Sequence, residues 1–169
     1  MMKKMMNALL PALSLVLLLA ACGGAPGQKD DAPQEPVDLN AFYEEQIQDG
    51  EWPAMALAEG EMLEGLYPGL SDLDLKQCVV SMAQISAAVG EIALVEASDA
   101  EGAKAAEELF QARIDYQVGD SSNPGGAWYP ESIEGWKKNS RIVTNGNYVM
   151  MVAGENAESV VEAFNALFA

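Results

Sequence analysis

The chain has 169 residues, and its 26 acidic side chains outnumber nine basic ones to give a formal net charge of −17. Such an acidic protein repels phosphate groups, which excludes nucleic acid as a partner. The chain contains no histidine, so it lacks the Ser-His-Asp and Cys-His catalytic groups and the usual ligands of a catalytic zinc ion.

The N-terminal segment has the organisation of a lipoprotein signal peptide. Two lysines precede an apolar run at residues 8–20, which is shorter than the roughly 20 residues of a membrane-spanning helix. The run ends in Leu-Ala-Ala followed by Cys22, which resembles the bacterial motif for attaching diacylglycerol to the cysteine and cleaving before it. We therefore expect a signal peptide at residues 1–21. Acyl chains such as palmitate on Cys22 would then anchor the protein to the extracytoplasmic face of the cell membrane.

Cleavage before Cys22 would have three consequences for the mature chain. It would remove two lysines and no acidic residue, so the net charge would change from −17 to −19. It would leave Cys78 as the only free thiol, and we expect this cysteine to be buried, unreactive and without a disulfide partner. Residues 22–37 are rich in Gly, Pro and polar residues, so they would form a flexible tether to a single domain at residues 38–169.

The first half of this domain is predicted to contain two helices and then two strands. Helical spacing of apolar residues, helix-capping residues and turn residues give the boundaries. The predicted elements are a helix capped by Asp38 that ends at Gly50, a weaker helix at 58–67, a turn at Pro68-Gly69, one helical turn at 71–74, and strands at 77–85 and 91–97.

The second half is predicted to repeat the order of helices followed by strands. Ser98 opens a capping box, so the longest helix should begin there and end at Gly119. After a polar loop at 119–127, the predicted elements are a helix from Pro130 to Lys138, a hairpin at 141–153 with Asn145-Gly146 in a type I′ turn, and a final helix capped by Asn156.

Paired strands separated by helices indicate an α+β fold. We expect a small antiparallel sheet of about four strands, arranged as two hairpins, with the helices packed mainly on one face. The order of the strands in the sheet does not follow from the sequence.

From Asp38 to Phe168, the chain shows a series of short motifs in a characteristic order. They are Phe42-Tyr43, Leu66-Tyr67, Ser81-Met82, Gly90-Glu91-Ile92-Ala93, Arg113, Tyr129-Pro130, Gly146-Asn147-Tyr148-Val149 and Phe164. In these motifs the chain resembles a family of bacterial lipoproteins called domain of unknown function 4358. The resemblance implies an envelope-attached domain that covers nearly the whole mature chain, and it supplies no catalytic residues.

Glu91 and Arg113 are the most informative charged residues. Glu91 begins a strand that should be half-buried, and Arg113 lies beside Ile114 on the apolar side of the longest helix. We expect them to form a structural ion pair between sheet and helix. The alternative is that Glu91 acts as a general acid.

Trp128, Tyr129 and Trp136 cluster after the polar loop. Aromatic residues next to a flexible loop can form a ligand-binding surface for a sugar or a peptide. They can equally attach a short helix to the core, which is the interpretation we favour.

These features favour a binding or accessory module without enzymatic activity, anchored through Cys22, whose partner is an unknown protein or small ligand. Two alternatives remain open: a carboxylate-dependent hydrolase that acts on an envelope polymer, and a structural homodimer formed through a sheet edge. The sequence Asp72-Leu73-Asp74 opens like a calcium loop, but Gln77 replaces its essential glycine. No metal or cofactor is therefore expected.

Overall fold

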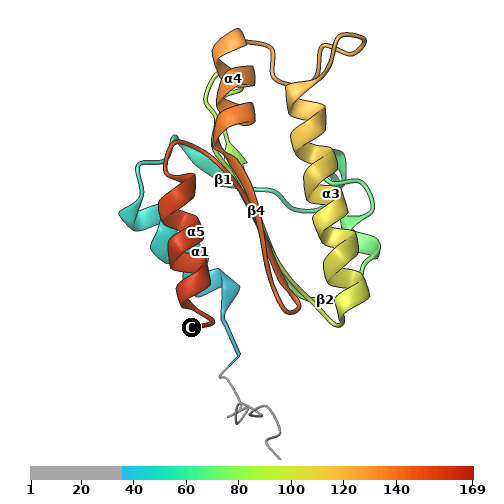
Figure 1. Cartoon of the computed structure of the whole chain (residues 1–169), viewed down its shortest axis with the longest axis vertical. Coiled ribbons are helices and arrows are strands. Elements are labelled where there is room, and N and C mark those ends of the chain that lie inside the picture. Colours follow the sequence, from blue (N-terminus) through green and yellow to red (C-terminus); the bar gives the residue numbers. More distant parts are fainter. Residues whose placement is uncertain (1–35) are drawn as a thin grey trace, which may run out of the picture. The chain divides into compact units, whose positions relative to one another are not determined.

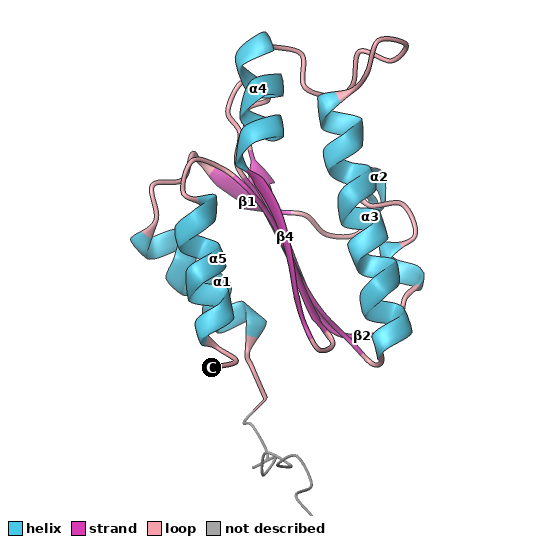
Figure 2. Cartoon of the chain, viewed as in Figure 1, coloured by secondary structure: helices cyan, strands magenta, loops and turns pink. Residues whose placement is uncertain are grey.

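A five-stranded antiparallel sheet lies at the centre of the computed structural model, which describes residues 36–169 (Figures 1 and 2). The strand order is β1-β2-β3-β5-β4. The strands are β1 (Met55–Leu57), β2 (Leu75–Ala83), β3 (Glu91–Ala97), β4 (Ser140–Asn145) and β5 (Tyr148–Ala153). The helices are α1 (Leu39–Asp49), α2 (Glu61–Leu66), α3 (Ala100–Val118), α4 (Pro130–Asn139) and α5 (Ala157–Ala166), with one 3₁₀ turn, η1 (Leu70–Asp72).

The predicted signal peptide at 1–21, the lipidation site Cys22 and all but the last two residues of the predicted tether lie outside the described residues. The first contact with the domain comes slightly earlier than expected. The side-chain amide of Gln77 donates to the main-chain oxygen of Val37 at 2.7 Å. Val37 also packs against one of the two cores, so it belongs to the domain.

Helices cover both faces of the sheet, because the central strands are apolar on both faces. Every residue of β3 is buried, and alternate side chains point to opposite sides. Ala93, Val95 and Ala97 face one core together with Phe110 of α3, whereas a second set faces the other core. That second set comprises Ile92, Leu94, Met150 and Val152, together with Leu39 and Phe42 of α1 and Val160 and Phe164 of α5.

Figure 2 shows the sheet almost edge-on, with α1 and α5 on one side and α3 on the other. The rings of Phe42 and Phe164 meet edge to face at 5.7 Å, which joins α1 to α5. Each such fully buried aromatic side chain contributes about 1.5–3 kcal/mol through removal of its surface from water.

The predicted α+β class with an antiparallel sheet is confirmed, and three details differ. Placing the helices mainly on one face was wrong, since a strand with a continuous apolar run needs cover on both sides. The sheet has five strands and not the four that were predicted. The strand that was missed is β1, which is only three residues long and too short to show a periodic pattern in the sequence. The hairpin also turns one residue later than predicted: Asn145 pairs with Tyr148, which leaves Gly146 and Asn147 as the turn residues.

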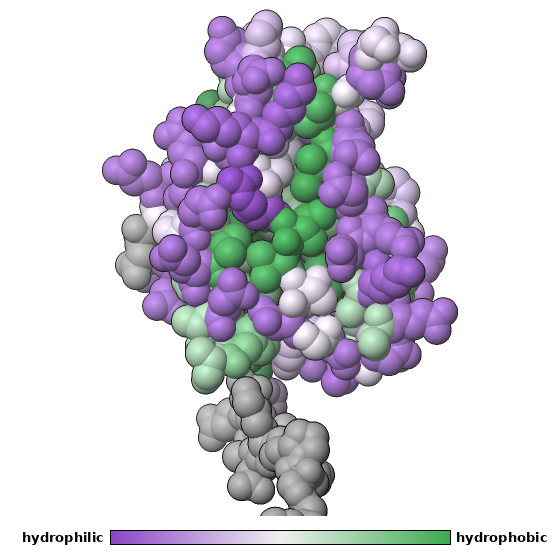
Figure 3. All heavy atoms as spheres, in the orientation of Figure 1, coloured by the Kyte–Doolittle hydropathy of each residue, from purple (hydrophilic) through white to green (hydrophobic). Residues whose placement is uncertain are grey.

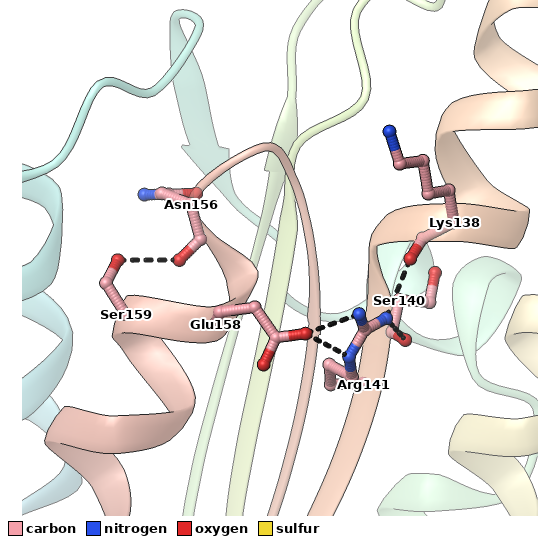
Figure 4. Close-up of polar contacts among 6 residues, drawn as sticks. All are labelled: Lys138, Ser140, Arg141, Asn156, Glu158 and Ser159. Atoms are coloured by element: carbon pink, nitrogen blue, oxygen red, sulfur yellow. Dashed lines mark hydrogen bonds and ion pairs between the residues drawn. The ribbon is translucent and has the colours of Figure 1, made fainter.

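Two predicted helix caps were also wrong in detail. Asp99, not Ser98, caps α3, and its side chain accepts a hydrogen bond from the Gly102 amide at 2.8 Å. Asn156 occupies the cap position of α5, but its side chain makes no capping hydrogen bond. Instead, its main-chain oxygen accepts from the Ser159 hydroxyl at 2.8 Å (Figure 4).

Within residues 36–169, no helix has the length and apolar character that crossing a membrane requires.

Candidate functional site

The candidate site is built around a buried ion pair between β3 and α3. Glu91 is the first residue of β3, and Arg113 lies on the buried side of α3. Tyr67 follows directly after α2, and Trp136 lies in α4. Four segments distant in sequence thus bring these side chains together inside the core on the α3 side of the sheet.

The two charged groups meet in a two-point geometry. Nε of Arg113 donates to Oε1 of Glu91 at 2.9 Å, and Nη2 donates to Oε2 at 2.7 Å. The hydroxyl of Tyr67 donates a further hydrogen bond to Oε1 at 2.5 Å. The guanidinium carbon of Arg113 lies 5.9 Å from the ring centre of Tyr67 and 5.7 Å from that of Trp136, so aromatic faces flank the cation.

Burial and charge shift the ionisation of the groups around Glu91. Desolvation, and then the negative charge of Glu91, raise the pKa of Tyr67 well above its ordinary value. Desolvation taken alone would lower the pKa of Arg113, but its hydrogen bonds to Glu91 and the charge of that carboxylate outweigh this effect and raise it. Tyr67 therefore stays neutral and Arg113 stays charged, as the geometry of the network requires.

This arrangement favours the structural interpretation of Glu91. Its two oxygens accept three hydrogen bonds, two of them from a cation. Both oxygens are occupied by these partners inside the core, where Glu91 is only 1% exposed, whereas a general acid must lie within hydrogen-bond reach of its substrate.

Two surface pockets lie on either side of this network. One, of about 450 Å³, lies between the end of α2 and the outer side of α3. The other, of about 240 Å³, lies between the β2–β3 connection and the end of α3. Leu66, Arg113 and Tyr116 line both pockets, so the ion pair lies beneath the point where the two meet.

The rim of these pockets is apolar and exposed. Tyr116 is 57% exposed and Ile85, in the β2–β3 connection, is 61% exposed.

The loop after α3 folds back onto the helix, because the Gly126 amide donates to the main-chain oxygen of Tyr116 at 2.7 Å. Two main-chain amides, from Ser122 and then Asn123, stabilise the Asp120 carboxylate in this loop and lower its pKa.

The three aromatic residues predicted as a cluster do not act together. Trp136 is 5% exposed and belongs to the core, as favoured from the sequence. Trp128 and Tyr129 are 85% and 50% exposed, so packing in the core was the wrong expectation for these two. Neither lines the two pockets beside Arg113.

A further pocket of about 370 Å³ lies at one end of the sheet. Three exposed glutamates, Glu51, Glu131 and Glu155, line it together with Trp52. It also borders Asn156, whose side-chain oxygen is buried without a hydrogen-bond partner. Three carboxylates therefore share the lining of this pocket.

Cys78 is exposed, so the prediction that it is buried was wrong. By alternation along β2, Cys78 lies on the same face of the sheet as Val80, but it precedes the buried residues Val79 and Val80 and stays exposed. Desolvation by its neighbours nevertheless raises the pKa of the thiol. A raised pKa leaves less reactive thiolate, in line with the expected low reactivity.

Sequence reasoning missed two residues of the site, Tyr67 and Tyr116. Tyr67 stood out only as part of a short motif, and its partner Glu91 lies 24 residues away. Tyr116 is an aromatic residue on an otherwise polar helix surface, a signal that could have marked it.

Comparison with known proteins places the chain in a family. It belongs to the family described as domain of unknown function (DUF4358), whose model matches residues 48–154. This range includes Tyr67, Glu91, Arg113, Tyr116 and Trp136. No curated protein and no solved structure matches the chain.

Proposed function

We propose that the protein is a binding or accessory module without enzymatic activity, held on the extracytoplasmic face of the cell membrane by lipid on Cys22. The ligand site in this proposal is the pair of pockets that meet at Leu66, Arg113 and Tyr116. The sequence of residues 1–22 supports the anchor, and the geometry around Glu91 supports the binding role.

The observation that carries the binding role is the neutralised floor of these pockets. Glu91 is paired with Arg113 and hydrogen-bonded by Tyr67, so the floor presents neither a free acid nor a free base. The exposed rim residues Tyr116 and Ile85 offer apolar contact instead. An uncharged or amphipathic ligand, such as a small aromatic molecule or an apolar peptide side chain, fits this chemistry.

The binding test uses the domain at residues 36–169, which contains both cores, and N-acetyl-tyrosine amide as an uncharged aromatic probe. Saturation-transfer NMR should detect the probe on the wild-type domain. Tyr116→Ala should weaken the signal strongly, because it removes the aromatic rim. Tyr129→Ala, a matched change of an exposed tyrosine outside the pockets, should leave it unchanged. Equal signals for the two variants would rule out this site.

The anchor is tested separately by metabolic labelling with a radioactive or clickable fatty acid. The wild-type chain should be labelled and should sediment with membranes, whereas Cys22→Ser should lose the label. Equal labelling of both proteins would contradict the lipid-anchor proposal and would leave the proposal for the ligand site unaffected.

The second candidate is a carboxylate-dependent hydrolase, favoured by the three glutamates that share one pocket. Paired carboxyl groups about 5–9 Å apart are what such chemistry needs. Release of soluble fragments from purified envelope polymer by the wild type, abolished by Glu131→Gln and retained by Glu134→Gln on the same helix, would replace the binding proposal with this one.

A further inference from the structure

We propose that the outer edge of β4 is the docking site for an extended peptide segment of another protein. The segment carries basic and apolar side chains and adds to the sheet as a further strand. This surface is distinct from the pockets at Arg113, so the inference goes beyond the proposed function.

The direction of the β4 main chain follows from two hydrogen bonds at the ends of β5. The Gly154 amide donates to the oxygen of Asn139 at 3.2 Å, and the Ala97 amide donates to the oxygen of Asn147 at 2.9 Å. Ser140 therefore faces Ala153 in a pair without mutual hydrogen bonds, and its main chain points away from β5. By alternation, Ile142 and Thr144 point the same way, to the open edge.

One end of this edge is already occupied. Nη1 of Arg141 donates to the main-chain oxygens of Lys138 and Ser140 at 2.8 Å and 2.7 Å (Figure 4). Nε of the same guanidinium donates to Glu158 of α5 at 2.8 Å, which holds it in place. Within residues 36–169, the outward main-chain groups of Ile142 and Thr144 receive no such cover. The open stretch is thus short, which suits a peptide strand better than a continuous sheet between subunits.

The side chains around the open stretch form an apolar strip between two helices. Ile142 packs toward the core on the α3 side, and Val143 packs toward the core on the α5 side. Both are only partly buried. Figure 3 shows the face on which β4 lies nearest the viewer, with a hydrophobic band running between hydrophilic flanks.

Charge selects the occupant. Glu107 on α3 accepts from the Thr144 hydroxyl at 3.2 Å and has no ion-pair partner among residues 36–169, whereas Glu158 on the α5 side is already paired with Arg141. A basic side chain on an incoming strand would meet the Glu107 carboxylate beside Thr144. A second copy of the chain, which carries the same net charge of −17, would be repelled.

The test measures amide hydrogen exchange in the lipid-anchored protein reconstituted into phosphatidylcholine nanodiscs. The probe is a peptide of alternating valine and lysine. It should slow exchange at the Ile142 and Thr144 amides by at least about tenfold at saturation, while the β1 amides stay unchanged. An N-methylated version, which cannot complete the ladder, should give no protection, and a valine–glutamate version should bind more weakly.

Two variants of one residue provide the matched control. Thr144→Pro removes the outward N–H at an edge position where proline is tolerated, and it should abolish peptide binding. Thr144→Val loses the same hydroxyl but keeps the N–H, so it should bind like the wild type. Glu107→Gln should raise the dissociation constant and reduce its dependence on salt.

Three results would overturn the proposal. Equal binding of the N-methylated peptide would show that the edge is not used, and so would lack of protection at Ile142 and Thr144. Protection of these amides without peptide would mean that the edge is already covered. If this protection without peptide increased with protein concentration, the occupant would be a second copy of the chain. If it did not depend on protein concentration, the occupant would be a segment of the chain itself.

Discussion

Glu91 and Arg113, which lie 22 residues apart in the sequence, form a two-point ion pair whose side chains are only 1% and 5% exposed. A buried pair contributes little net stability, because removing two charges from water costs about as much as their attraction returns. The pair does, however, fix the position of α3 on the sheet. Only when Arg113 lies over Glu91 can α3 pack on β3 without leaving a buried charge unpaired.

Breaking this pair from one side should therefore be severe. Arg113→Met leaves the Glu91 carboxylate buried without its cation. It should lower the free energy of unfolding, measured by urea denaturation, by about 3–5 kcal/mol. The double variant Glu91→Met, Arg113→Met should recover a large part of the loss. The control is the exposed pair Arg141–Glu158, where Glu158→Gln should cost less than about 1 kcal/mol. A single-variant cost as small as the control would contradict the assignment.

Tyr67→Phe removes the hydroxyl that donates to Glu91 and should cost about 1.5–3 kcal/mol, because the lost hydrogen bond is to a charged group. Desolvation and the charge of Glu91 raise the pKa of Tyr67, so the folded state retains a proton that the unfolded chain loses near pH 10. The corresponding stability is complete below that pH and is lost as the pH rises toward the folded pKa.

Denaturation across alkaline pH should show this decline in the wild type, with a shallower slope in Tyr67→Phe. Tyr148 provides the comparison. Desolvation and the neighbouring Glu96 also raise its pKa, but it is only partly buried. Absorbance titration should therefore show Tyr148 ionising in the folded protein and Tyr67 ionising only as the protein unfolds. Identical slopes in the two proteins would contradict this role of Tyr67.

Cys78 should react slowly with a thiol reagent although its surface is exposed. Desolvation raises the pKa of the thiol, so at pH 8 the folded protein contains less thiolate than a free cysteine does. The rate of labelling in a Cys22→Ser background should rise on denaturation in urea. A folded-state rate equal to that of a model thiol would show that desolvation has no effect there.

Gly119 and Gly60 both have positive φ angles, 65° and 53°, but their surroundings differ. A Cβ at Gly119 would lie 2.5 Å from the main-chain oxygen of Asn123, whereas nothing lies within 4 Å of one at Gly60. The ψ angles of −125° at Gly60 and −172° at Gly119 place both residues outside the left-handed helical region, so Gly60→Ala should cost about 1–3 kcal/mol from backbone strain alone. Gly119→Ala should cost clearly more than Gly60→Ala, because the loop must also move. Thermal denaturation of the two variants tests this difference, and equal costs would contradict it.

Local signals predicted the elements well where they were long. The Asp38 cap, the strand Glu91–Ala97 and the end of the longest helix at Gly119 all match the structure. The failures concern short or competing signals. Met55–Leu57 is too short for a period to show. At the hairpin, Gly146 and Asn147 form the turn in place of Asn145 and Gly146, because pairing with β5 sets the register.

The candidate site, too, was predictable from the sequence only in part. Residue type and helix position were enough to suggest Glu91 and Arg113 as a pair, because a base on an apolar helix stripe needs a partner. Nothing in the sequence connected Tyr67 or Trp136 to them, since packing between distant segments creates those contacts. The pockets and the open edge of β4 likewise depend on how α2, α3 and α5 lie against the sheet.

For this protein, the linear order of residues was sufficient for the acidic charge, the lack of histidine chemistry and the boundaries of the longer helices and strands. These follow from side-chain chemistry and from interactions within one turn or one strand. The two-sided burial of β3, the burial of Trp136 beside an exposed Trp128 and the position of β4 at the edge of the sheet formed by residues 36–169 were settled by the folded arrangement alone. Each depends on which surfaces meet across long separations in sequence, and no local pattern records that.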